Sequence, residues 1–253
     1  MTEATQHNQV PSADSPSIAS RSALLLPLPP LQRPGSRYRI SDAVYAQLSE
    51  SIRNLGLPPG TPISEPGIAA QLQVSRSPVR EAFTRLADMG LVLVIPQVGS
   101  FIAPISLAEV DDSVFIRSAL ETKAFKRAIE AGVPDTTEMQ KFVDANRAAA
   151  AAQDSEAFFA TDEQVHQSVF VLAGVPRLWD VVRSTKLQLD RLRRLSLPVS
   201  IRNPELVDEH QRIVDALRTR DEAAGVSVIE NHATRIFAMV DGLKAENPSY
   251  FAP

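Results

Sequence analysis

The segment that decides the fold is Val74-Ser75-Arg76-Ser77-Pro78-Val79-Arg80-Glu81-Ala82. Ser75 and Ser77 are both favourable residues for the N-terminal cap of a helix, and a proline is tolerated in the first helical turn. The segment therefore predicts a helix that begins near Ser75 and places Arg76 and Arg80, one turn apart, close to its N-terminus. The apolar face of this helix is formed by residues at helical spacing, namely Val79, Phe83 and Leu86.

Two helical patterns precede this segment, and a β-hairpin pattern follows it. We expect helices near 44–55 and 64–72, because apolar residues recur there at helical spacing. The β-branched run 91–95 and the return run 101–103 flank a turn that contains proline and glycine. Three helices followed by a hairpin predict a winged helix-turn-helix over residues 36–104.

The composition of the segment favours contact with double-stranded DNA. In a helix-turn-helix, the N-terminal residues of the second motif helix reach base edges in the major groove. Arg76 and Arg80 suit this position, because arginine contacts phosphate or pairs with guanine. Ser75 and Ser77 are able to donate to phosphate while also capping the helix. The alternative is that the two arginines are solvated helix charges, with Glu81 as a local partner.

The charge balance rules out a polycationic protein but permits a local basic site. The chain has 26 Lys and Arg against 30 Asp and Glu, which gives a net charge of −4. Basic and acidic residues are also close to balanced within 36–104, and phosphate neutralisation supplies much of the affinity for DNA. One such domain should bind DNA weakly, which favours a homodimer on an operator with two half-sites.

The rest of the chain is predicted to be helical, apart from its two ends. Residues 1–35 are rich in proline and serine and show no helical period, which predicts a disordered tail, and 248–253 are expected to form a short C-terminal tail. No apolar run is long enough for a membrane helix, so we expect a cytoplasmic protein. Residues 105–247 predict an all-α six-helix bundle, with helices at about 107–131, 135–152, 154–173, 176–197, 203–219 and 222–246.

The histidines point to a metal site inside this bundle. The chain has four histidines and no cysteine, which excludes thiolate metal ligands and disulfides. His7 lies in the tail and is expected to be solvated. His166, His210 and His232 each fall on the apolar stripe of a different predicted helix, and Asp162 lies one turn before His166. Three imidazoles and a carboxylate on facing stripes suit Zn²⁺, Ni²⁺, Mn²⁺ or Fe²⁺.

Structural roles remain open for the charged and imidazole side chains of this region. A single histidine inside a helical domain is more often a satisfied core residue than a ligand. Arg117 has an i, i+4 surface pair with Glu121 as its alternative interpretation. The remaining arginine cluster predicts a solvated helix face, formed by Arg191, Arg193 and Arg194.

The N-terminal motifs resemble the DNA-binding domain of GntR-family transcription regulators. The matching pieces are Leu57-Pro58-Pro59-Gly60, the block from Ser75 to Ala82, Leu86-Ala87-Asp88-Met89-Gly90-Leu91, and Gly99 in the wing. The resemblance implies that Ser75, Arg76, Ser77, Arg80 and Gly99 form the DNA-binding site. Two departures are Glu65-Pro66-Gly67, where relatives often carry an arginine that contacts DNA, and a wing without a basic residue.

Residues 105–247 resemble the FadR-type C-terminal ligand-binding domain, the FCD domain, in its shorter six-helix VanR-like form. The matching pieces are residues 116–121, 162–166, 209–217 and the final His232. Metal-binding members of that family use one aspartate and three histidines at these places. The resemblance thus implies a divalent metal as cofactor and a small organic acid as effector, with Arg117 as a further anchor for its carboxylate. The implied ligands are Asp162, His166, His210 and His232.

Three functions follow from these patterns. The first is a transcription regulator whose operator binding is modulated by a small carboxylate held at the metal. The second is a metal-sensing regulator, in which the ion itself is the signal. The third is a metal-dependent hydrolase fused to a DNA-binding head, which is disfavoured because H-E-x-x-H is absent and Glu163 and Glu209 fall off the inner stripes. We therefore expect that the protein is not an enzyme.

Overall fold

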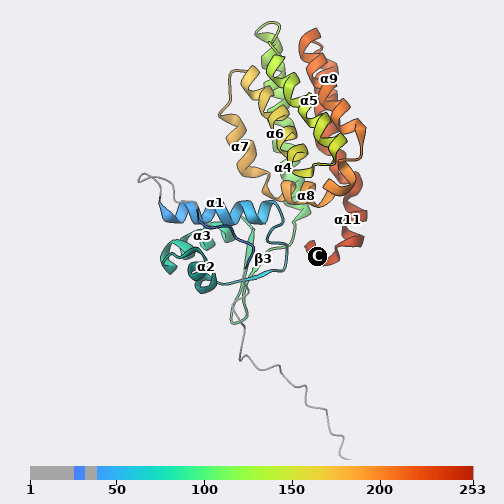
Figure 1. Cartoon of the computed structure of the whole chain (residues 1–253). Coiled ribbons are helices and arrows are strands. Elements are labelled where there is room, and N and C mark those ends of the chain that lie inside the picture. Colours follow the sequence, from blue (N-terminus) through green and yellow to red (C-terminus); the bar gives the residue numbers. More distant parts are fainter. Residues whose placement is uncertain (1–25, 32–38, 253) are drawn as a thin grey trace, which may run out of the picture.

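The computed structural model describes residues 26–31 and 39–252. An N-terminal unit of short helices and a small sheet lies beside one end of a bundle of longer helices (Figure 1). This arrangement confirms the mainly α class and the order of a winged helix-turn-helix followed by a helical domain. The tail expected at 1–35 lies outside the described residues, together with His7, except for residues 26–31.

The helix-turn-helix is built as its sequence pattern predicts. Ser64 caps the first motif helix, because its hydroxyl accepts from the amide of Gly67 at 3.1 Å. Gln73 takes a left-handed conformation between the two motif helices, with φ at 54°. The apolar faces of all three helices meet in one core, which buries Leu48 and Leu86. The helices are α1 (Ile40–Arg53), α2 (Glu65–Leu72) and α3 (Arg76–Asp88).

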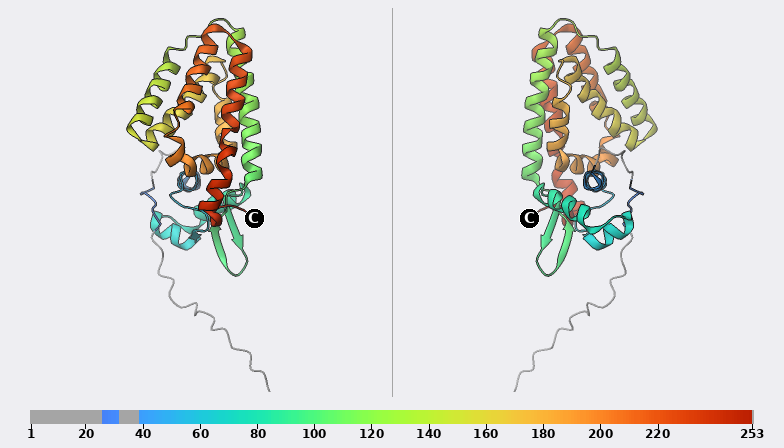
Figure 2. Two further views of the ribbon diagram at one scale, coloured as in Figure 1. Left: turned by 90° about the vertical axis from the view of Figure 1, so that its right-hand side faces the viewer. Right: turned by 90° about the vertical axis from the view of Figure 1, so that its left-hand side faces the viewer.

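The wing is an antiparallel hairpin to which a third, very short strand is added. Its strands are β1 (Pro62–Ile63), β2 (Val92–Ile95) and β3 (Gly99–Ile102), in the sheet order β1-β3-β2. The sequence pattern did not predict β1, because two residues are too few to show a strand period. The hairpin points away from the helical bundle (Figure 2).

The helical domain contains the long helices that were expected, within one or two residues at most ends. Side-chain caps fix several starts, since Asp154, Asn203 and Asp221 each accept from a backbone amide of the first turn. Every helix among the described residues is too short or too polar to cross a membrane. The helices are α4 (Leu107–Glu130), α5 (Thr137–Ala152), α6 (Ser155–Leu172), α7 (Leu178–Thr185), α8 (Leu187–Ser200), α9 (Pro204–Thr219), α10 (Glu222–Thr234) and α11 (Val240–Glu246).

The prediction of six continuous helices is wrong in two places. The helix expected over 176–197 is divided at Lys186, where the carbonyl of the preceding Thr185 accepts from Ser113 Oγ of α4 at 2.8 Å. Its second half, α8, then continues through Pro198 to Ser200. The helix expected over 222–246 is interrupted by a 3₁₀ segment, η1 (Arg235–Met239). Apolar spacing continues across both breaks, so the pattern does not reveal them.

Helices α4 and α10 lie side by side along the bundle (Figure 2). Gly225 of α10 allows this close approach, because a Cβ atom there would lie 2.0 Å from Cζ of Phe125. Phe125 is fully buried in the main core of the helical domain. The missing side chain of Gly225 therefore sets how closely the two helices pack.

Segments near both ends of the chain pack against the folded domains. Leu26 is buried against the winged helix-turn-helix, and its amide donates to Gln71 Oε1 at 3.2 Å. This part of 1–35 therefore departs from the predicted disorder, because its leucines are apolar enough to join the core. Residues 248–252 are likewise packed, since Phe251 is buried and pairs with Ile105 in a parallel bridge.

Helix α8 joins the two domains through buried charges. Asp190 is fully buried and binds Lys186 Nζ at 2.7 and 2.9 Å and Arg53 Nη1 of α1 at 3.2 Å. Burial alone would raise the pKa of Asp190, but the charges of Lys186 and Arg193 lower it. The guanidinium of Arg191 is also buried and donates to the carbonyl of Ala103 at 2.6 Å.

Candidate metal centre and nucleic-acid interface

The N-terminus of α3 presents the predicted DNA-binding side chains to solvent. Ser75, Arg76, Ser77 and Arg80 are all exposed on one end of this helix. Ser75 occupies the N-cap position, but its side chain makes no capping hydrogen bond, contrary to our expectation. Gly99 is exposed at the start of β3 with φ at +144°, a conformation that side chains rarely adopt.

Arg80 has a partner that the sequence did not reveal. Its Nε atom lies 3.2 Å from Oε2 of Glu65, the first residue of α2, whereas Glu81 was the expected local partner. The Arg80 side chain nevertheless remains 71% exposed. An exposed ion pair of this kind contributes little to stability, so the guanidinium is able to exchange Glu65 for a phosphate or a base.

The four predicted metal ligands come together inside the helical domain. Asp162 and His166 belong to α6, His210 to α9 and His232 to α10, and all four are buried. One ligand atom from each residue lies within 4.8 Å of the others. His210 Nε2 is 3.4 Å from an oxygen of Asp162, and His166 Nε2 is 3.2 Å from His232 Nε2.

The opposite nitrogen of each imidazole has an acceptor of its own. His166 Nδ1 lies 2.5 Å from Glu121 Oε1, and His232 Nδ1 lies 2.8 Å from Glu209 Oε2. His210 Nδ1 lies 3.2 Å from Oδ1 of Asn146. An ionised carboxylate or an amide oxygen accepts a hydrogen from Nδ1, and in that tautomer the Nε2 lone pair of each ring points into the shared space.

The orientation of the Asn146 amide is fixed independently. Its Nδ2 atom donates to the carbonyl of Phe158 at 2.8 Å and to Thr161 Oγ1 at 2.9 Å. The amide oxygen therefore faces His210 as an acceptor. In consequence His210 Nε2 carries no hydrogen, and this buried atom has no hydrogen-bond partner among the described residues.

Electrostatics keep these ligands in the ionisation states that a cation requires. Burial lowers the pKa of His166 well below its usual value and lowers that of His232 to about 3. Burial opposes ionisation of Asp162, yet the Arg193 charge holds its pKa well below the usual range. The imidazoles of His166 and His232 are therefore neutral, and the carboxylate of Asp162 is ionised, at neutral pH.

Several residues that support the ligands were misjudged or missed. Glu209 is buried and accepts from both His232 and Arg235, although it was placed off the inner stripe. Arg193 pairs with Asp162 and lies 2.9 Å from Glu163 Oε1. The predicted solvated face is wrong for the whole arginine cluster, because each side chain has an acidic or carbonyl partner and is largely buried: Arg191, Arg193 and Arg194.

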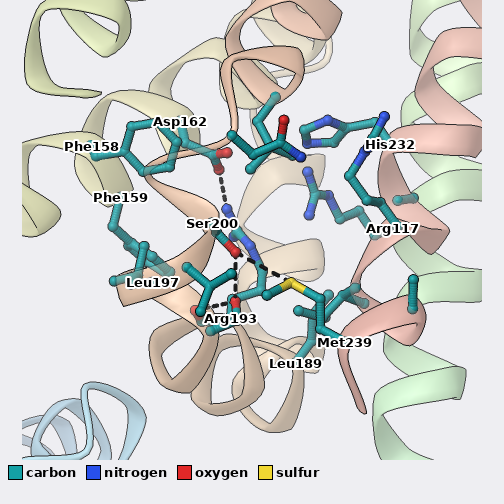
Figure 3. A pocket seen from close by; sticks show the side chains of 18 residues that line it. Arg117, Phe158, Phe159, Asp162, Leu189, Arg193, Leu197, Ser200, His232 and Met239 are labelled. Carbon is teal, nitrogen blue, oxygen red and sulfur yellow. Dashed lines mark hydrogen bonds and ion pairs between the residues drawn. The ribbon is translucent and has the colours of Figure 1, made fainter. Parts of the chain in front are cut away.

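A cavity of about 270 Å³ opens beside the four ligands (Figure 3). Asp162 and His232 line it, and Arg117 projects into it from α4. Arg117 is 3% exposed and lies 3.4 Å from Glu121 Oε2, so the i, i+4 pair exists but is buried. Its Nη2 atom has no hydrogen-bond partner among the described residues. A buried guanidinium of this kind suits an anion that enters the cavity.

A DNA-reading head joined to a helical domain with a ligand cavity is the architecture of a transcription regulator with an effector-binding domain. Residues 40–102 match the model for bacterial regulatory proteins of the gntR family, and residues 112–235 match the FCD domain. The chain belongs to the GntR family and carries an FCD domain, as the sequence motifs implied.

Similar proteins agree with this assignment. The chain is 33% identical over 209 residues to an uncharacterized HTH-type transcriptional regulator of Streptomyces ambofaciens, covering 83% of this chain and 88% of that protein. It is 32% identical over 215 residues to the HTH-type transcriptional repressor RspR of Escherichia coli K12, covering 84% and 94%. The solved structure of E. coli McbR/YncC has the same fold, with a TM-score of 0.65 at 20% identity over 81% of this chain and 98% of that one. The first two of these proteins are named as a transcriptional regulator and a transcriptional repressor.

Proposed function

We propose that operator binding by this regulator is modulated by a small carboxylate, held at a divalent metal ion in the helical domain. Asp162, His166, His210 and His232 would hold the ion. When bound, the ion would supply open coordination positions that accept oxygen atoms of the effector. Arg117 would be the second anchor for the same carboxylate.

The observation that carries the metal proposal is the convergence of the Nε2 atoms of three imidazoles. Nε2 of His166 and Nε2 of His232 lie 3.2 Å apart, next to the carboxylate of Asp162. With the hydrogen of each ring on Nδ1, such an arrangement is repulsive unless a cation lies between the atoms. The nitrogen and oxygen donors fit zinc, nickel, manganese or iron, in keeping with a chain that has no cysteine.

The DNA-binding part of the proposal rests on the exposed end of α3. Arg76 and Arg80 would contact bases or phosphates, while Ser75 and Ser77 would donate to phosphates and Gly99 would let the wing approach the backbone. The modest basicity of the head supports binding as a homodimer to two half-sites. Because an operator is chromosomal DNA, the proposal includes a cytoplasmic location.

The metal site is tested by elemental analysis of the purified full-length chain, wild type against His210→Ala. We expect the wild type to carry about one divalent ion per chain. Removal of a residue that supports a metal ligand typically lowers metal affinity by about 10–100-fold. His210→Ala removes a ligand itself, so its metal affinity should fall by more than this. Asp208→Ala is the control, since it removes an exposed carboxylate from the same helix.

Two results would count against the proposal. A wild-type protein that neither carries nor takes up zinc, nickel, manganese or iron has no such site. Equal metal content in wild type and His210→Ala would show that any bound ion lies elsewhere. If instead operator binding responds to the ion alone over a physiological range, without any acid, the protein is a metal sensor.

A further inference from the structure

We infer that the effector is an amphiphilic acid: one carboxylate joined to an apolar body, and not a polyhydroxylated sugar acid. This inference rests on the proposed function, because it describes the ligand of the same cavity. It follows from how the polar and apolar side chains are distributed around the cavity and from which polar groups already have partners (Figure 3).

Two polar atoms that lack partners lie at, or next to, one end of the cavity. Arg117 Nη2 and His210 Nε2 are both buried and have no hydrogen-bond partner among the described residues. Arg117 lines the cavity itself, whereas the ring centroid of His210 lies 4.8 Å from that of His232, which lines the same end as Arg117. One compact anionic group would satisfy this end of the cavity, directly at Arg117 and through the ion at the imidazoles.

The remaining wall is mostly apolar. Ten of the 18 lining residues have aliphatic, aromatic or thioether side chains. They come from α6, from α8, from the start of α9 and from the end of α10 with η1. Leu189, Leu197 and Met239 lie on the part of the wall away from the Arg117 guanidinium, and Leu206 and Ile236 also line the cavity. Burying an aliphatic or aromatic body against such a wall is favourable in proportion to its apolar area.

The polar side chains within this wall are already engaged by the protein. Ser200 donates to Ser196 at 3.0 Å, and Ser196 donates to the carbonyl of Arg193 at 2.8 Å. Asn203 uses its side-chain oxygen to cap α9, accepting from the amide of Glu205 at 3.1 Å. The hydroxyl hydrogens of both serines are thus in use, so these side chains leave a ligand only hydroxyl lone pairs and the amide hydrogens of Asn203.

The two basic side chains of this wall are engaged as well. The guanidinium of Arg193 is held by Asp162 and Glu163, and that of Arg235 by Glu205 and Glu209. A ligand with several hydroxyl groups would therefore leave most of them buried without partners, which costs binding free energy for each group.

The test compares three six-carbon probes on the full-length protein loaded with zinc: hexanoate, gluconate and 1-hexanol. Hexanoate and gluconate share chain length and charge and differ in five hydroxyl groups, whereas 1-hexanol lacks the carboxylate. The readouts are the thermal midpoint, with and without a chelator, and calorimetric affinity. We expect hexanoate to raise the midpoint by roughly 3–5 °C for each tenfold increase above its Kd. Gluconate and 1-hexanol should each bind at least about 100-fold more weakly.

Two variants locate the binding in this cavity. Arg117→Lys keeps the charge but loses the planar fork, and should weaken hexanoate about tenfold or more. Ile236→Gln replaces a partly exposed part of the apolar wall and should weaken hexanoate without weakening gluconate. Val171→Gln is the matched control, because Val171 is exposed on α6 and does not line the cavity.

The outcomes separate this inference from the proposed function. Preferential, chelator-sensitive binding of hexanoate that both cavity variants weaken supports the inference. Chelator-sensitive binding of gluconate in preference to hexanoate overturns it but leaves the carboxylate effector standing. If neither acid binds the zinc-loaded protein, both the inference and the carboxylate part of the proposed function fail.

Discussion

Arg80→Ala should abolish specific operator binding while leaving the fold intact. Arg80 is exposed at the end of α3 and pairs only with Glu65 among the described residues, so its truncation removes no core contact. A bidentate arginine–guanine pair contributes about 1–3 kcal/mol of discrimination. A homodimer would lose this amount at both half-sites, so specific affinity should fall by roughly 30-fold to more than 10,000-fold. The measurement is fluorescence anisotropy on a duplex that the wild-type protein has enriched from random DNA.

Arg85→Ala is the matched control for this experiment. It removes the same charge from the same helix, but Arg85 stacks on Tyr45 at 3.9 Å and pairs with Asp42. We expect it to weaken binding only slightly, through the general field of the domain. Unchanged specific binding by Arg80→Ala, or an equal loss in both variants, would contradict the assignment of Arg80 as a base-reading residue.

Gly225→Ala should strongly destabilise the helical domain, although the same change stabilises most helices. The new Cβ would lie 2.0 Å from Cζ and 2.4 Å from Cε1 of Phe125, a ring that is fully buried. Overpacking of this kind costs about 1–3 kcal/mol or more, because α4 and α10 must separate or the ring must leave its position. The melting temperature should fall by roughly 2–12 °C in differential scanning calorimetry.

Gly242→Ala separates the steric effect from helix propensity. Gly242 lies in α11, and a Cβ atom there would meet nothing within 4 Å. This variant should be neutral or more stable by up to about 1 kcal/mol, as expected for an open helical position. If both variants change stability in the same direction and by similar amounts, the contact between Gly225 and Phe125 does not limit the packing of the two helices.

The sequence predicted those parts of the fold that depend on local patterns. Helix starts at Asp154, Asn203 and Asp221 carry side-chain caps, and such signals lie within a few residues of the helix they start. The strand β1 and the break at Lys186 depend instead on distant partners, β3 and Ser113. The spacing of apolar residues along the sequence does not reveal such distant partners.

In the candidate site, too, features set by local patterns were predicted and features set by distant partners were not. The four candidate ligands lie on apolar stripes, where a histidine or an aspartate is conspicuous, and the sequence predicted that they come together. Their partners were not, because Glu121, Asn146 and Glu209 reach the imidazoles from other helices or from another face. The buried state of Arg193 was also missed, since only the fold places Asp162 and Glu163 around a side chain that resembles a surface charge.

The buried guanidinium of Arg191 fixes the backbone of the segment that connects the two domains. It binds the carbonyls of Ala103 and Pro104, while Arg53 and Asp190 tie α1 to α8 alongside. In the proposed homodimer, the α3 helices of the two subunits would thus be held at a fixed distance from each other and at a fixed angle around the DNA axis. We expect about five base pairs, half a turn of DNA, inserted between the half-sites to remove most specific binding in a gel-shift assay, and strong binding to the lengthened duplex would contradict a stiff joint. The protein would then be selective for the spacing between the two half-sites of its operator, a property that neither domain has alone.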